Sequence, residues 1–161
     1  MIGRRTNVLL DKVLLGNDST SHLFYLPDHV TAAARLRGEL FSENAEDFFL
    51  IARNAFPWQR VADVVVGRPA YDNYLVGLAI RHNVTVVDAT LTVVALHQTD
   101  RDGNYAGHAN SDSNFNSIRI GPFNYNTGLT TSAQYETRFT VDRKWNRTEV
   151  TLVKRSMAQK H

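Results

Sequence analysis

The chain has 161 residues, of which 43% are hydrophobic and 21% are charged, a balance typical of a folded globular protein and unlike a disordered chain. Its length fits one domain with a core of its own. The formal net charge is only +2, and cations cluster only in the tail "VKRSMAQKH", which argues against a nucleic-acid partner. Because cysteine is absent, disulfides and thiolate metal sites are excluded.

No apolar run in the sequence approaches the about 20 residues that span a bilayer, and "MIGRRTNVLLDKVLL" lacks the pattern of a signal peptide. We therefore expect a soluble protein without a membrane segment, cytoplasmic unless a longer parent chain directs it to the Golgi or the secretory pathway. Asn-x-Ser/Thr triplets begin at Asn17, Asn83 and Asn146, but such triplets arise often by chance and say little without a signal.

The first half of the chain predicts a strand, a short helix and two more strands. The opening "IGRRTNVLL" is predicted to be a strand over residues 2–10. A helix should follow, since "DHVTAAARLRGEL" begins with Asp28 as an N-cap and has Gly38 where a helix would stop. Next come "EDFFLIA", an apolar run of strand length, and "VADVVVG", a β-branched run closed by Gly67.

The strongest helix signal runs from Pro69 to about His82, where apolar residues recur at helical spacing. Two buried strands, "VTVVD" and "LTVVALH", are expected after it. This order predicts an α/β fold whose sheet is covered on both faces. Farther on, "YETRFTVD" and "RTEVTLVKR" indicate two strands, or a strand and a helical end. We expect one α/β domain over residues 1–155 and a polar tail over 156–161.

Two acids are candidate functional residues. Asp72 falls in the first turn of the predicted helix, where a carboxylate caps free amides and is favoured by the helix dipole. With Arg68 and Asn73 beside it, just past a strand end, it also lies where an α/β sheet meets the polar groups of a substrate. Asp47 in "AEDFF" is the second acid, and its structural alternative is a residue at a strand edge. Spacing alone leaves these alternatives open.

His97 ends an apolar strand. A histidine in this position is commonly a packing or hydrogen-bonding residue, and its functional alternative is a metal or phosphate ligand. The loop "DRDGNYAGH" begins with acids spaced as in a calcium loop, but it lacks the required glycine and bidentate acid, which rejects an EF-hand. As an Asp-x-Asp metal motif it is short and therefore weak.

Three segments resemble a known family. "AEDFFLIARNAFPW", "VVVGRPAYDNYLVGLA" and "VTVVDATLTVVALHQ" are similar, in this order, to the C-terminal part of GT-A-type glycosyltransferases, the nucleotide-diphospho-sugar transferase superfamily. A looser resemblance continues through "SNFNSIRIGPFNYNTGLTTSAQYET". The resemblance implies a partial GT-A-like mixed sheet flanked by helices. Such a chain would lack the N-terminal nucleotide-binding half, because it starts after the point where that half should end.

The resemblance also implies a reaction, the transfer of a sugar from a nucleoside-diphosphate sugar to an acceptor hydroxyl, with Mn²⁺ or Mg²⁺ as the cofactor of the complete domain. Asp72 matches the catalytic base, with Asp47 in reserve. His97 matches a ligand of the metal or the diphosphate, and Arg68 would neutralise the departing diphosphate. The remaining expected substrate-binding residues are Tyr71, Asn73 and Gln98.

The family's Asp-x-Asp motif is matched only at Asp100, downstream of the wrong strand. We therefore expect a glycosyltransferase-like domain that is inactive alone. The alternatives are a non-catalytic carbohydrate- or protein-binding remnant and a structural domain with no ligand. Half of a sheet should leave an unpaired edge or an apolar face that promotes self-association. Asp72 and His97 should lie at the same end of the sheet and face a shared cleft.

Overall fold

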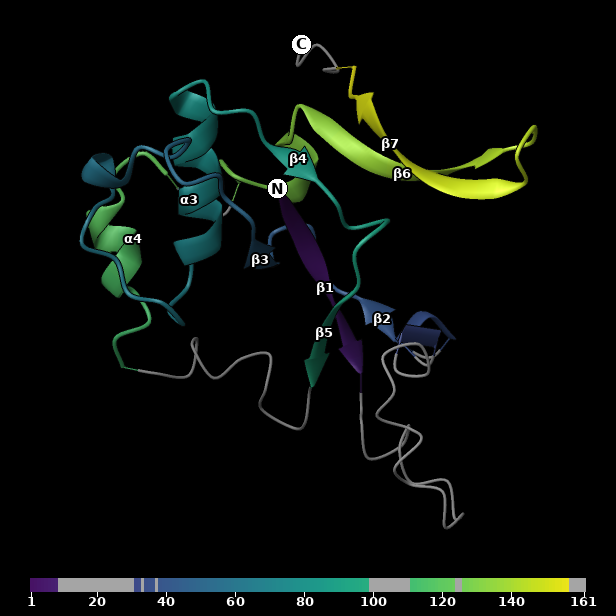
Figure 1. Ribbon diagram of the computed structural model, residues 1–161. Helices are drawn as coiled ribbons and strands as arrows, with labels where there is room; N and C mark the ends of the chain where they lie inside the picture. Colours follow the sequence, from purple (N-terminus) through teal and green to yellow (C-terminus); the bar gives the residue numbers. More distant parts are fainter. Residues whose placement is uncertain (9–30, 33, 37, 99–110, 124–125, 157–161) are drawn as a thin grey trace, which may run out of the picture.

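The computed structural model describes residues 1–161 except 9–30, 33, 37, 99–110, 124–125 and 157–161 (Figure 1). The described residues form an open, mixed sheet with few helices, which confirms the predicted α/β class. None of the described helices combines the length and apolar character needed to cross a membrane. The strands are β1 (Ile2–Val8), β2 (Glu39–Leu40), β3 (Glu46–Phe49), β4 (Val87–Asp88), β5 (Ala95–Gln98), β6 (Tyr135–Asp142) and β7 (Arg147–Lys154). The helices are α3 (Tyr71–Arg81) and α4 (Phe115–Arg119), with 3-10 turns η2 (Trp58–Arg60) and η3 (Thr130–Ser132).

Strand β1 organises the sheet. The short strands β2 and β3 pair with it antiparallel, whereas β4 and β5 pair with it parallel. Strand β4 also pairs parallel with β6, and β6 forms an antiparallel hairpin with β7, so the order along the sheet is β2-β1-β4-β6-β7. Because β1 and β5 are parallel, their carboxyl ends meet at the same edge.

Helix α3 confirms the predicted helix and forms the centre of the core. It starts after Ala70, which has a left-handed φ of 66°, and all seven residues from Asn73 to Ala79 are buried. A helix buried on every side must be crossed closely by other segments. A Cβ at Gly128 would lie 1.9 Å from the carbonyl oxygen of Asn73, so only glycine permits this crossing. The buried core contains Ile2, Phe56, Ala70, Tyr74, Leu75, Val76, Leu78, Ala79, Val86, Ile120 and Ala133.

The strand predicted over residues 61–67 is wrong. The side chain of Asn116 binds both backbone groups of Val65: Oδ1 accepts the Val65 N–H at 2.8 Å and Nδ2 donates to the Val65 carbonyl at 2.9 Å. The N–H of Val64 turns back to the carbonyl of Ala62 at 2.7 Å. The side-chain amide of Asn116 therefore occupies the N–H and carbonyl of Val65 that a neighbouring strand would otherwise bond. Because of this, the β-branched run forms a loop.

Three other predicted strands are shorter than expected. Only Glu46–Phe49 of "EDFFLIA" forms β3, only Val87–Asp88 of "VTVVD" forms β4, and only the end of "LTVVALH" enters β5. Before β4, the N–H of Val84 returns to the carbonyl of Ala79 at 2.9 Å, and before β5 the N–H groups of Thr92 and Val93 return to the carbonyl of Ala89, at 2.9 and 2.8 Å. Local hydrogen bonding therefore overrides the strand preference of the β-branched residues.

The helix expected after Asp28 is confirmed for its described part. Residues 31–32 and 34–36 are helical, and the N–H of Gly38 donates to the carbonyl of Ala34 at 2.8 Å, which closes the last turn. Residue 28 itself lies outside the described residues, so its capping role stays a prediction.

The hairpin β6–β7 confirms the predicted pair of strands, but it contradicts the expectation of a sheet covered on both faces. Figure 1 shows α3 and α4 on one side of β1 and the hairpin reaching away on the other. Large apolar side chains on the hairpin, including Val141 at 65% exposure and Leu152 at 58%, are open to solvent. An antiparallel pair can keep one face in water, which the continuous apolar strands of a buried parallel sheet cannot.

Candidate functional site

Three strands bring their polar side chains together at Asp47. Its Oδ1 accepts a hydrogen bond from Arg5 Nη1 at 3.3 Å, and its Oδ2 lies 3.1 Å from His97 Nδ1. Arg5 belongs to β1, Asp47 to β3 and His97 to β5. The side chains of Asp47 and His97 are 23% and 28% exposed, so solvent reaches this group. We refer to Arg5, Asp47 and His97 as the polar cluster.

The register of the strands explains this convergence. Asn7 pairs with His97 across β1 and β5, and residues two apart on a strand share a face, so Arg5 and His97 lie on one face of the sheet. Gly3 pairs with Phe48 and Arg4 with Glu46, so Asp47 is the extra residue of a β-bulge. Bulges re-aim side chains and are frequent beside functional sites.

Asp47 fixes the chemistry of the imidazole. A carboxylate cannot donate, so a hydrogen bond between the two requires the proton of neutral His97 to be on Nδ1. Nε2 is then the nitrogen with the available lone pair, and it has no hydrogen-bond partner among the described residues. An imidazole oriented by a carboxylate can take a proton at Nε2, donate one when charged, or bind a metal.

Next to Asp47 on β3, the buried carboxyl group of Glu46 lies beside the half-buried Asp72. Asp72 Oδ2 accepts the backbone N–H of Glu46 at 3.2 Å, and Asp72 Oδ1 accepts that of Asn73 at 3.1 Å. Burial, with the charge of Asp72 second, raises the pKa of Glu46 to about 9, so this side chain holds a proton at neutral pH. Burial also raises the pKa of Asp72, against the hydrogen bonds from backbone N–H groups.

Asn73 ties this buried region together. It is fully buried, and its Nδ2 lies 3.2 Å from each of three oxygens, the carbonyls of Asn44 and Gly128 and Oε2 of Glu46. These contacts connect α3, β3 and the segment before η3. These hydrogen bonds hold the surrounding segments together, and the predicted role of Asn73 in substrate binding stays a prediction.

The predicted site residues are therefore brought together in part. Asp72 and His97 contact adjacent residues of β3, the first through Glu46 and the second through Asp47. Neither lines the cavity of about 480 Å³ that is bounded by Phe49, Leu75 and Val76 among other apolar residues. The shared cleft expected between Asp72 and His97 stays a prediction.

The other predicted substrate-binding residues lie outside the polar cluster. Arg68 is half-buried, and its carbonyl accepts a hydrogen bond from Asn116 Nδ2 at 3.2 Å. Tyr71 packs against the apolar core. Gln98 ends β5, but its side chain lies outside the described residues, as does Asp100. Roles for these residues in substrate binding stay predictions.

A metal ion at His97 would need further donor side chains close to the imidazole. Among the described residues, no group of three or more His, Asp or Glu side chains could hold a metal ion. The carboxylate nearest to His97 is already bonded to Nδ1 and serves to orient the ring. The described residues thus offer a single open imidazole nitrogen, and the Mn²⁺ or Mg²⁺ cofactor expected for the complete domain stays a prediction.

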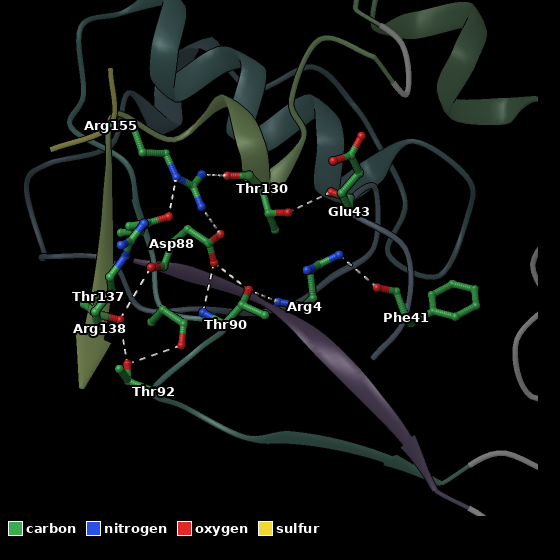
Figure 2. Close-up of polar contacts among 12 residues, drawn as sticks. Arg4, Phe41, Glu43, Asp88, Thr90, Thr92, Thr130, Thr137, Arg138 and Arg155 are labelled. Atoms are coloured by element: carbon green, nitrogen blue, oxygen red, sulfur yellow. Dashed lines mark hydrogen bonds and ion pairs between the residues drawn. The ribbon is translucent and has the colours of Figure 1, made fainter. Parts of the chain in front are cut away.

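A second set of ion pairs connects β4, β6 and the end of β7. Figure 2 shows Arg155 donating from Nη2 to Asp88 at 2.7 Å and from Nη1 to the carbonyl of Thr130 at 2.7 Å, and its Nε donates to Glu136 at 2.8 Å. Thr130 Oγ1 in turn donates to the carbonyl of Glu43 at 3.1 Å. Hydrogen bonding from Arg155 lowers the pKa of Glu136. We refer to Arg155, Asp88 and Glu136 as the Arg155 network.

The predictions missed Arg5 and Arg155, although the sequence contains a signal for each of them. Arg5 and Asn7 stand two apart within a predicted strand, which indicates one polar strand face. Arg155 ends an alternating run, although the sequence alone grouped it with the basic tail. The protonated state of Glu46 has no such signal, because it depends on burial by segments distant in sequence.

Comparison with known proteins adds no relative: no family model matches the chain, and searches of curated proteins and of solved structures find no match.

Proposed function

We propose that this chain supplies the acceptor-side part of a sugar-transfer site, a glycosyltransferase-like domain whose reactive group is His97. The observation that carries the proposal is the geometry at Asp47, where a bulge residue holds Nδ1 of a partly exposed imidazole whose Nε2 bonds to none of the described residues. The edge at which β1 and β5 end is also where α/β sheets gather their ligands. The resemblance of "GRPAYDNYL" and "VVDAT" to GT-A enzymes gives the class of reaction.

In the proposed reaction, the acceptor hydroxyl oxygen attacks the anomeric carbon of the donor sugar and gives its proton to His97 Nε2. The bond between that carbon and the diphosphate oxygen breaks, and its electron pair leaves with the nucleoside diphosphate. Asp47 stabilises the imidazolium through the Nδ1–H hydrogen bond. Arg5, on the other oxygen of Asp47, holds the carboxylate in place.

This proposal moves the base from Asp72 to His97. Both oxygens of Asp72 already accept backbone N–H groups, at 3.2 and 3.1 Å, which ties the carboxylate to the structure around Glu46. His97 Nε2 is not engaged in this way among the described residues. The donor-binding part of the site is not assigned to any described residue.

The experiment measures saccharide binding to the chain by calorimetry, and release of nucleoside diphosphate from UDP- and GDP-sugars in the presence of acceptors. His97→Gln should weaken acceptor binding about tenfold, the worth of one strong hydrogen bond, and lower any turnover about 100-fold or more. His82→Gln, a histidine at the end of α3, is the matched control and should change neither.

Two results would overturn the proposal. Saccharide binding that is independent of His97, without turnover under any donor, would favour the non-catalytic carbohydrate-binding alternative. Absence of both saccharide binding and turnover would favour a structural domain.

A further inference from the structure

The β6–β7 hairpin has two chemically different faces. Phe139 pairs with Val150, and Thr137 pairs with Leu152, so these side chains share one face with Val141. The opposite face carries charged and hydroxyl side chains, because Arg138 pairs with Thr151, Thr140 with Glu149 and Asp142 with Arg147. The four large apolar residues Phe139, Val141, Val150 and Leu152 are 45%, 65%, 57% and 58% exposed.

The tip of the hairpin places an aromatic ring among cations. Trp145 is 64% exposed, and Lys144 Nζ lies 5.0 Å from its ring centroid. Arg143 and Arg147 flank this pair and are exposed. The only acid of the turn, Asp142, accepts the backbone N–H groups of residues 144 and 145 at 2.9 and 3.3 Å, so its carboxylate holds the turn in shape.

Charge is concentrated in this part of the molecule. Residues 135–156 contain six cations and three acids, whereas the whole chain has a net charge of only +2. The cations and the exposed apolar face meet at Trp145, at the end that reaches farthest from β1 (Figure 1). Tryptophan prefers the boundary between an apolar phase and water, and cations there attract anionic lipid headgroups.

We propose that the β6–β7 hairpin docks on a membrane surface rich in anionic phospholipid, with Trp145 at the interface, Val141 against the acyl boundary and Arg143, Lys144 and Arg147 among the headgroups. Charge complementarity selects this partner, because a nucleic acid would match the cations but leave the apolar face in water. The proposal concerns a surface separate from the polar cluster and does not depend on sugar transfer.

The experiment is sedimentation of the full chain with vesicles of pure phosphatidylcholine, or with vesicles in which about a third of the lipid is phosphatidylglycerol. We expect binding to the anionic vesicles only, reversed by high salt. The variant Arg143→Gln with Lys144→Gln should bind about 30-fold more weakly, which corresponds to about 1 kcal/mol for each cation. The matched control is Arg53→Gln with Arg60→Gln, which removes two exposed cations far from the tip and should bind as the wild type does.

Tryptophan fluorescence provides a second reading. The chain has two tryptophans, so a Trp58→Phe background reports Trp145 alone, and its emission should shift to the blue with anionic vesicles. Equal loss of binding in the control variant, or no binding to either vesicle, would overturn the proposal. A dimer in light scattering without vesicle binding would instead assign the hairpin to a second copy of the chain. Tighter binding to a single-stranded oligonucleotide than to vesicles would assign it to nucleic acid.

Discussion

The polar cluster and the Arg155 network are both built from ion pairs, yet they differ in how completely their groups are bonded. In the Arg155 network, the guanidinium binds two carboxylates and one carbonyl, and Asp88 and Glu136 are 6% and 8% exposed. In the polar cluster, each oxygen of Asp47 makes one contact, and Nε2 of His97 has no hydrogen-bond partner within the described ranges. A closed, buried network holds strands together, whereas an open group at a strand end can receive a ligand.

The largest expected effect concerns the closed network. Arg155→Met should lower the free energy of unfolding by about 3–5 kcal/mol, because it leaves the buried carboxylate of Asp88 without its cation and Glu136 with Arg138 alone. The matched control is Arg147→Met at the start of β7, where loss of the exposed ion pair with Glu149 should cost less than about 1 kcal/mol. Urea unfolding measures both. Equal effects of the two variants would show that burial does not distinguish these ion pairs.

The next effect concerns pH, and it has opposite signs for Glu46, the neighbour of Asp47 on β3, and for the Arg155 network. The pKa of Glu46 is raised from 4.5 to about 9, so its stabilising contribution is complete below about pH 4.5 and is lost as the pH rises toward 9. Glu46→Gln should therefore be more stable than the wild type by about 2–3 kcal/mol at pH 7. Unfolding curves from pH 5 to 9 measure this, and an unchanged slope in the variant would contradict a protonated Glu46.

The Arg155 network should respond at acid pH. Hydrogen bonding from Arg155 depresses the pKa of Glu136, so the stability from this group is present above about pH 4.5 and is lost as the pH falls through the lowered pKa. Glu136→Gln should remove part of the acid-induced loss of stability and leave the alkaline side unchanged. An altered alkaline side in this variant would show that the two regions are not independent.

The smallest expected effect on stability belongs to the polar cluster. Asp47→Asn should change the free energy of unfolding by less than about 1 kcal/mol, because the pairs it removes are partly exposed. The same substitution should weaken acceptor binding, since His97 loses the carboxylate that fixes its tautomer. A loss of stability comparable to that of Arg155→Met would mean that the polar cluster is a structural network as well.

The elements that could be predicted are those with a strong local pattern. Periodicity was sufficient for α3, and alternation indicated β6 and β7, although a helical end stayed open as the alternative for the second of them. The loop over residues 61–67 could not be predicted, because the side chain that replaces its strand partner, Asn116, is about 50 residues away. Distant partners of this kind leave no signal in a local window.

The candidate site divides in the same way. The positions of Asp47, Asp72 and His97 near strand and helix ends were sufficient to select them as candidates. The residues that contact them could not be predicted in this way. The contact between Asp47 and His97 depends on a bulge in the β1–β3 register, and the burial of Asn73 depends on a segment that crosses α3 at Gly128. Register and close crossings are properties of the packed structure, so sequence patterns alone could not assign roles to these residues.

The central claim is that His97 is an open, oriented imidazole that meets a ligand. The most direct measurement is a long-range ¹H–¹⁵N NMR spectrum of the histidine rings, assigned with His97→Gln, during titration with an acceptor saccharide and a nucleoside-diphosphate sugar. We predict an Nδ1–H tautomer for His97 in the free protein and a shift of its Nε2 resonance as the ligand is added. An Nε2–H tautomer, or an Nε2 resonance that does not move while the saccharide binds elsewhere, would contradict the claim.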